Sequence, residues 1–423
     1  MRVILSAKSV HPFHPVGGVQ KYVYYFAKHL AQNGIDLEIV APLDNGKPRT
    51  ETFEGLQYTL LRPAIYRYLE YPVGWLGVHM FSSALNRYLQ KRPFDLLHSF
   101  DMTGYHYAKN KIRQPIIAHI FTDNYLSNPI SLMNPLNLFG LTGSGINKIK
   151  EQKIKISPYS DLVTKLKYLP QYLFKTKPVY RCMKQSEAVF FEADIFRNEV
   201  NTLYRLNPQK SSVLPVGTDI TFIRNVVAAA SVSRGDIGLN KEDIVLITVN
   251  RLAADKGVDK IVLALEKAVK EDPRLKLIII GSGYQEKEIY ETIGKKGLWG
   301  HVLHFKNVPE DKLYQYYNLS DIYVSAFSYP GSSISTLEAM ACSLPVITTA
   351  QPWLIQDDAN GIILGSNSPD AIARAVLRMT REGRLEKKGK ASEDIVKNFN
   401  WDGIARNAIG KYEEVTRVYS QNH

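Results

Sequence analysis

Short apolar runs alternate with amphipathic stretches along most of the chain. The runs that predict strands are Arg2–Ala7, Leu37–Ala41, Phe94–Ser99, Pro115–Ile120, Ala188–Phe191, Ser212–Val216, Asp243–Val249, Leu275–Ile280, Val302–Phe305, Ile322–Ala326 and Pro345–Thr349. The stretches with helical periodicity are Tyr22–Asn33, Lys256–Lys270, Gln285–Ile293, Ser333–Ala341 and Asp370–Arg381. Such alternation is typical of parallel α/β units.

The strand series restarts near Asp243, after a stretch that we interpret as irregular, Gly217–Asn240, and as a hinge. With 423 residues the chain is long enough for two cores. We expect an N-terminal domain over residues 1–217, a C-terminal domain over 218–400, and a final helix over 401–423 that crosses back to the first domain. Both domains are expected to be Rossmann-like and doubly wound, facing a cleft. Such sheets bind ligands at the carboxyl ends of their strands.

Charge separates the two halves. The net charge is +12, and residues 1–215 hold 27 Lys and Arg against 15 Asp and Glu, so the whole excess lies there. Much of it falls within Lys148–Lys184, where apolar and aromatic residues are interleaved with the cations. This pattern fits docking on an anionic surface, and a solvated surface explains it equally well. The surrounding stretch Asn124–Gln185 is poor in strand signals and predicts a partly helical insertion in the first domain.

The first residues form no secretory signal, and we find no apolar stretch of membrane-spanning length. The two cysteines, Cys182 and Cys342, form neither a disulfide framework nor a zinc pattern. These features favour a reducing, cytoplasmic location, with peripheral attachment to the inner face of the membrane where the basic half docks. Nucleic-acid binding also suits the charge, but no recognition motif supports it.

Three segments of the second half follow a predicted strand and open a helix. The first, Asn250–Gly257, offers backbone N–H groups and two cations, Arg251 and Lys256, to a leaving diphosphate. A helix cap with two surface ions would look the same. The second, Ile280–Gln285, carries Gly281, which a tight strand-to-helix turn explains best; close approach of the backbone to a ligand is the alternative.

The third segment is Tyr329–Cys342, a small-residue loop that opens a helix and again offers N–H groups to anionic oxygens. Glu338 lies one turn in, where its carboxylate would accept bonds from two ribose hydroxyls. The competing interpretation is a capping box, Ser335-x-x-Glu338, in which Glu338 only closes its own helix. In the first half, Pro15–Gln20 places Gly17 and Gly18 before a helix, which is a weak signal alone.

Taken in order, these motifs resemble the GT-B glycosyltransferases of the large retaining family that includes sucrose synthases and phosphatidylinositol mannosyltransferases. Further matching segments are Leu214–Asp219, Phe305–Pro309 with its Leu-Tyr helix and Asp321, Asn360–Ile363, and the final helix near Trp401. The resemblance covers nearly the whole chain. It implies a metal-independent transfer of a sugar from a UDP-sugar or GDP-sugar to a glycan or lipid-linked acceptor, with retention and with no other cofactor. The chain has no Asp-x-Asp, which argues against the metal-dependent GT-A class.

The resemblance assigns roles to single residues. Arg251 and Lys256 would bind the donor diphosphate, Glu338 the ribose, and backbone around Val308 the base. Donor contacts would also come from Gly17, Gly18, Gly281, Ser332, Ser333, Ile334 and Ser335, and Gln20 would lie on the acceptor side. His119 is the candidate for the family's donor-contacting histidine, with a buried core histidine as the alternative, and His98 is a weaker candidate.

The chain departs from the family at Pro330, which stands where a glutamate usually contacts the donor sugar. Ser332 and Ser333 would supply hydroxyls instead. Gln20 replaces a more frequent glutamate. These departures keep two alternatives open: a non-catalytic GT-B scaffold or partner protein, and a GT-B sugar-nucleotide epimerase.

Overall fold

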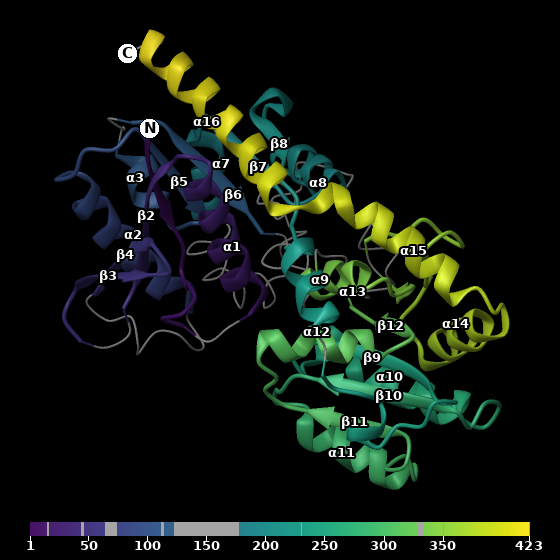
Figure 1. Ribbon diagram of the computed structural model, residues 1–423. Helices are drawn as coiled ribbons and strands as arrows, with labels where there is room; N and C mark the ends of the chain where they lie inside the picture. The colour runs from purple at the N-terminus through teal and green to yellow at the C-terminus, as the bar shows by residue number, and fades with distance from the viewer. Residues whose placement is uncertain are drawn as a thin grey trace, which may run out of the picture. The chain divides into compact units, whose positions relative to one another are not determined.

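The computed structural model describes residues 1–14, 17–43, 46–63, 74–110, 114–121, 177–229, 231–328, 333–349 and 351–422. The chain divides into two compact units, one of Met1–Pro215 with Trp401–His423 and one of Val216–Asn400 (Figure 1). Most of the predicted insertion, and the residues 329–332 with Pro330 and Ser332, lie outside the described residues.

The N-terminal unit is built on an eight-stranded sheet with the order β3-β4-β2-β1-β5-β6-β7-β8. Only β3 runs antiparallel to its neighbour among the described strands. The strands are β1 (Arg2–Ser6), β2 (Asp36–Pro42), β3 (Arg49–Phe53), β4 (Leu56–Leu61), β5 (Leu96–Phe100), β6 (Ile116–Ile120), β7 (Ala188–Phe191) and β8 (Ser211–Val213). The helices are α1 (Gly18–Gln32), α2 (Gly74–Leu89), α3 (Tyr105–Lys109), α7 (Lys177–Gln185), α8 (Asp194–Tyr204) and α16 (Trp401–Asn422).

The second unit carries a six-stranded parallel sheet with the order β11-β10-β9-β12-β13-β14. Its strands are β9 (Ile244–Val249), β10 (Leu275–Ile280), β11 (Val302–Phe305), β12 (Ile322–Ser325), β13 (Val346–Thr348) and β14 (Gly361–Ile363). Its helices are α9 (Ile220–Ala228), α10 (Val258–Ala268), α11 (Glu286–Lys295), α12 (Glu310–Asn318), α13 (Ile334–Ala341), α14 (Pro369–Arg381) and α15 (Leu385–Val396). Strands of nearly continuous apolar residues are buried on both faces by helices, as parallel sheets require.

The expected fold class is therefore confirmed: both units are α/β with mainly parallel sheets. One expectation is wrong. The stretch Gly217–Asn240 is not irregular, because α9 spans Ile220–Ala228 within it. The Asp219 side chain accepts a hydrogen bond from the Phe222 N–H at 3.0 Å and caps this helix, a start signal that the sequence already carried.

Helix α7 forms the described end of the basic run. Its apolar residues Val179, Cys182 and Met183 are buried in the core of the N-terminal unit, while Arg181 and Lys184 are exposed. Burial raises the pKa of the Cys182 thiol to about 12. The apolar face of this segment is therefore occupied by the protein's own core.

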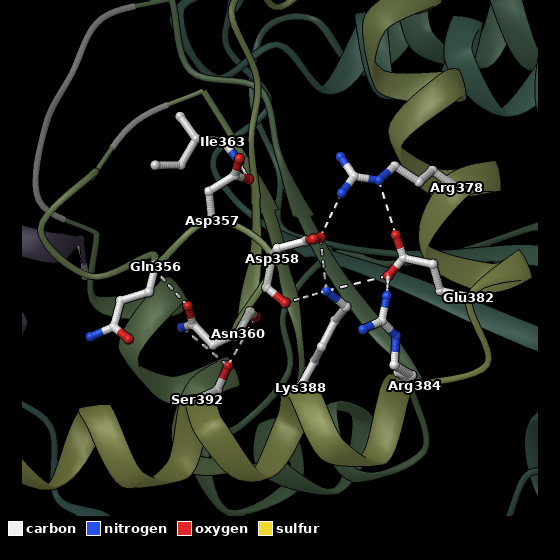
Figure 2. A network of polar contacts seen from close by, with 10 residues as sticks. All are labelled: Gln356, Asp357, Asp358, Asn360, Ile363, Arg378, Glu382, Arg384, Lys388 and Ser392. Atoms are coloured by element: carbon white, nitrogen blue, oxygen red, sulfur yellow. Dashed lines mark hydrogen bonds and ion pairs between the residues drawn. The ribbon is translucent and has the colours of Figure 1, made fainter.

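A polar network in the second unit fixes the turn before β14 (Figure 2). Lys388, only 2% exposed, donates to the Asp358 carbonyl oxygen at 2.6 Å and lies 3.3 Å from Glu382 Oε2. Asp358 adopts a left-handed backbone conformation with φ of 69°. Glu382 also pairs with Arg378 and Arg384. Because the buried ammonium has carboxylate and carbonyl partners, this network holds α14, α15 and the Gln356–Gly361 turn together.

Candidate functional site

The strand order of the second sheet reverses at β9, which lies between β10 and β12. In a doubly wound sheet this reversal opens a crevice outside the carboxyl ends of the two central strands. Three segments follow the carboxyl ends of β9, β10 and β12, and they contain most of the donor-site residues expected from the sequence.

The loop Asn250–Gly257 lies directly against its neighbours on both sides. Gly257 has φ of 65°, and a Cβ there would lie 2.2 Å from the Ala326 carbonyl oxygen at the end of β12. On the other side, a Cβ on Gly281 would lie 2.1 Å from the Asn250 carbonyl oxygen. Both glycines are required for this close packing. Gly281 therefore has a structural function: it forms the tight turn that lets the loop pack against Asn250.

Arg251 and Lys256 are held at opposite ends of one short turn by the same carboxylate. Arg251 Nη2 lies 3.9 Å from Asp255 Oδ2, and Lys256 Nζ lies 3.4 Å from it. The Arg251 side chain is 68% exposed. Lys256 is more enclosed and lies over the Phe327 ring, 5.0 Å from its centroid. The turn thus presents two cations with one counter-charge, an arrangement suited to a dianionic or trianionic group.

Helix α13 begins beside this loop, after β12. Ser333 is its N-cap, but the Ser333 hydroxyl makes no capping bond and instead bonds with the Ser335 hydroxyl at 2.8 Å. No acidic residue lies in the first turn. Ile334 and Ser335 are half-buried in that turn, where backbone N–H groups have no partner within the helix. Such a helix start attracts anionic oxygens.

Glu338 does not form the capping box that the sequence allowed. The residue is 3% exposed, and its carboxylate lies 3.4 Å from the Tyr314 hydroxyl and 3.3 Å from the Tyr317 hydroxyl, both on α12. Burial, followed by the charge of Glu338, raises the pKa of the Tyr317 hydroxyl well above its ordinary value. Two phenols of α12 therefore lie within hydrogen-bond distance of the Glu338 carboxylate.

Sequence reasoning missed these tyrosines. Their signal was the spacing Tyr314-x-x-Tyr317, which places both side chains on one face of the helix before β12. Tyr314 also donates to Glu310 Oε1 at 2.9 Å. One phenol proton cannot serve two carboxylates, so the longer contact to Glu338 is the one a ligand hydroxyl would replace more easily.

Gln351, just after β13, was also missed. Its side chain is completely buried, and neither its amide nitrogen nor its amide oxygen has a hydrogen-bond partner within the described part of the chain. Its φ of 69° is in the left-handed region. Nothing in the sequence signals this residue. Val308, the expected base contact, lies half-exposed between β11 and α12.

In the N-terminal unit, Gly17 is the N-cap of α1 and Gly18 its first residue, and both are exposed. A Cβ on Gly18 would meet no atom within 4 Å. The Gln20 side chain donates to the Ser9 hydroxyl at 2.6 Å. The start of α1 thus leaves an exposed glycine pair with a polar side chain near it.

His98 and His119 lie inside the core of the N-terminal unit, and neither is exposed. His98 Nε2 and His119 Nδ1 share a hydrogen bond of 3.1 Å, and His98 Nδ1 shares one of 2.6 Å with the Tyr412 hydroxyl. Burial lowers the pKa of His98 to about 3, and burial together with His98 lowers that of His119. His119 thus has the setting of a buried core histidine, and in this conformation it reaches no solvent.

Within the described ranges, no group of three or more His, Cys, Asp and Glu side chains is placed to hold a metal ion. None of the described helices has both the length and the apolarity needed to cross a bilayer.

Comparison with known proteins gives two matching family models. Residues 16–222 match Glycosyltransferase Family 4, and residues 231–398 match Glycosyl transferases group 1. The chain is 24% identical over 427 residues to an uncharacterized glycosyltransferase of Methanocaldococcus jannaschii, covering 95% of this chain and 94% of the relative. It is 23% identical to a D-inositol 3-phosphate glycosyltransferase of Segniliparus rotundus, covering 55% of this chain and 53% of that protein. Several of its curated relatives are thus matched over only about half of their length.

Solved structures share the fold over almost the entire chain. Sucrose-phosphate synthase from Thermosynechococcus elongatus superposes with a TM-score of 0.74 at 17% identity, covering 99% of both chains. Anabaena HepE, solved in complex with UDP and glucose, gives a TM-score of 0.67 at 14% identity, covering 98% of this chain and 100% of that one.

Proposed function

We propose that this chain, which belongs to the glycosyltransferases of the GT-B fold, transfers a sugar from a nucleoside diphosphate sugar to an acceptor. The observation that carries the proposal is the set of groups that lie beyond the ends of the two central strands of the second sheet, β9 and β12. There two cations, the start of α13 and a buried carboxylate follow the ends of adjacent strands. This set would serve two parts of a donor: the cations and the helix start would bind the diphosphate, and the carboxylate would bind the ribose.

In the proposed reaction Arg251 and Lys256 bind the diphosphate and stabilise the charge that develops as the glycosidic bond breaks. N–H groups at the start of α13 bind the same oxygens. Glu338, oriented by Tyr317, accepts bonds from the ribose hydroxyls. The sugar transfers with retention, and the leaving phosphate helps to deprotonate the acceptor on the same face. Because two cations already face the diphosphate, we propose that no metal is required.

The first test is a thermal-shift panel of UDP, GDP, ADP and CMP on the wild type and on Lys256→Ala, with and without EDTA. A native-state ligand raises the unfolding midpoint by mass action. We expect one diphosphate to stabilise the wild type, equally in EDTA, and to have little effect on the variant. Stabilisation by none of them would support the scaffold alternative, for which Pro330 is the main sequence evidence.

The product's configuration tests retention. Proton NMR during turnover should show a product anomer with the same configuration as the donor. An inverted anomer would overturn the proposed stereochemistry while leaving glycosyl transfer intact. Release of free nucleotide without any acceptor, accompanied by a sugar isomer, would instead support the epimerase alternative.

We further propose that the acceptor is a glycan or a lipid-linked group engaged by the N-terminal unit, which holds all of the net positive charge. Gln20 is the proposed acceptor-side residue, and Gly17 and Gly18 at the start of α1 are proposed to contact the donor. Sedimentation with anionic and with neutral liposomes tests the membrane part. Binding to anionic vesicles that declines with salt is expected, and negligible binding to both would refute it.

A further inference from the structure

Tyr284 exposes more of its surface than any other large apolar or aromatic side chain in the described ranges. Its exposed fraction is 76%, although it belongs to the loop between β10 and α11. This loop follows one of the three strand ends at the crevice. Single exposed apolar side chains are ordinary on a protein surface, so the position of this ring beside the cation-bearing loop matters more than its exposure.

Both ends of this tyrosine are nevertheless fixed. The Ala254 N–H, from the segment between Arg251 and Lys256, donates to the Tyr284 hydroxyl at 2.9 Å. At the other end, the Leu252 N–H donates to the Ser282 carbonyl at 2.9 Å, and the Gln285 N–H donates to the Leu252 carbonyl at 3.1 Å. The ring is thus anchored on the cation-bearing loop by its hydroxyl and by its backbone.

Gly283 allows this anchoring. A Cβ at position 283 would lie 2.2 Å from the Leu252 carbonyl oxygen, so no other residue would let the two loops approach so closely. The Tyr284 loop also contacts the next strand, since the Gly281 N–H donates to the Phe305 carbonyl at 2.9 Å. Tyr284 therefore belongs to a rigid strip that runs from the cationic turn after β9 to the end of β11.

A fixed, exposed aromatic ring is suited to bind another flat group. Because the Tyr284 ring is already held in one orientation in the free protein, stacking on it costs little further side-chain entropy. Offset stacking of aromatic rings is favourable beyond the area that it buries. The part of a nucleoside diphosphate that is both flat and distant from the charged phosphates is its base.

We propose that Tyr284 stacks on the nucleobase of the donor. The inference rests on the proposed function, because it takes the diphosphate to lie on Arg251 and Lys256. Stacking accepts any base, so Tyr284 supplies affinity for the nucleoside, and base identity is read elsewhere.

Titration calorimetry tests this with the nucleoside diphosphate that the wild type binds among UDP, GDP, ADP and CDP, and with inorganic pyrophosphate. Tyr284→Ala should weaken nucleotide binding about fivefold or more, the lower end of the loss on removing an aromatic ring that stacks on a base. Pyrophosphate binding should change less than about twofold, because no base is present. Tyr284→Phe retains the stacking face and should stay within about threefold of the wild type.

Trp299→Ala is the matched control: Trp299 is another exposed aromatic residue of this unit, 57% exposed, after α11. It should bind both ligands like the wild type. Equal nucleotide affinity in Tyr284→Ala and in the wild type would overturn the stacking inference and leave the proposed function intact. A parallel loss of pyrophosphate binding would also overturn it, by showing that Tyr284 only supports the cationic loop. If the wild type binds no nucleoside diphosphate, the proposed function itself fails.

Discussion

The two sheets of this protein place polar side chains near their strand ends in opposite settings. In the N-terminal unit, His98 and His119 lie within β5 and β6, are completely buried, and bond to each other. In the second unit, Arg251 and Lys256 lie beyond the end of β9, on a turn, and remain accessible. A difference of a few positions along a strand therefore separates a residue that builds the core from one that meets a ligand. Four predictions test how complete this division is.

The largest effect is expected at the accessible cations. Lys256→Ala and Arg251→Ala should each reduce the turnover number about 100- to 1000-fold, the typical loss when a group that stabilises leaving charge is removed. Thermal unfolding should change little. Lys270→Ala, which removes a 68% exposed lysine paired with Glu266, is the control and should retain full turnover. Normal turnover in both cation variants would show that Arg251 and Lys256 do not act on the leaving group.

The buried histidines should dominate the pH dependence of stability instead. The native-state pKa of His98 is about 3, below the ordinary 6.5, because burial disfavours its charged form. As pH falls below about 6.5, the His98 imidazole therefore becomes protonated in the unfolded chain but stays neutral in the native state. The stability contribution is complete above that pH and is lost as pH falls toward the native pKa.

Urea unfolding between pH 7 and pH 4.5 measures this loss. Replacement by the non-titrating residue, in His98→Asn and in His119→Asn, should reduce the slope by about 1.4 kcal/mol per pH unit for each histidine. Parallel slopes in wild type and variants would show that these groups titrate normally, and would return His119 to consideration as a residue that reaches solvent.

Glu338 is intermediate between the two settings, because it is buried yet lies at the crevice. Glu338→Gln should weaken binding of the donor nucleotide about tenfold through loss of a charged acceptor. The wild type should bind the 2′-deoxy nucleotide less tightly than the ribose form, and the variant should distinguish them less. If discrimination persists unchanged, Glu338 serves only to hold α12 against α13 through Tyr314 and Tyr317.

The smallest effect is expected at the shared counter-charge. Asp255→Asn removes a carboxylate within 3.9 Å of Arg251 and 3.4 Å of Lys256. The diphosphate should then bind about two- to fivefold more tightly at low ionic strength, the range of an exposed ion pair. The gain should disappear in high salt. Weaker binding would show that Asp255 positions the cations more than it neutralises them.

Much of the fold could be predicted because central parallel strands are continuous apolar runs. Ala188–Phe191, Leu275–Ile280 and Val302–Phe305 were predicted with the bounds that the structure has. The antiparallel strand β3 was missed, because Arg49–Phe53 is a polar edge strand with one face exposed and no apolar run. Helix α9 was also missed, although Asp219 supplied its start signal in the sequence.

The candidate site shows the same limit. Turns that follow a strand and carry glycine and cations can be recognised from order and spacing, as at Asn250–Gly257. Contacts made across the fold leave no such pattern. Examples are the two α12 phenols on Glu338 and the buried amide of Gln351, whose surroundings depend on strands far apart in the sequence.

The C-terminal helix has a consequence for synthesis of the protein. Trp401 of α16 packs on Tyr22, and the Tyr412 hydroxyl of the same helix shares a hydrogen bond with His98. The N-terminal unit therefore lacks part of its core until α16 has been made. Residues 216–400 are translated in between, which at ordinary ribosome speeds takes roughly ten to forty seconds. During that interval the second unit can fold, because it is one uninterrupted segment. The first unit meanwhile exposes the apolar surface on which α16 will later pack. The unit that leaves the ribosome first is thus the unit that is completed last. We expect a chaperone to bind the nascent chain at the apolar surface that α16 later covers.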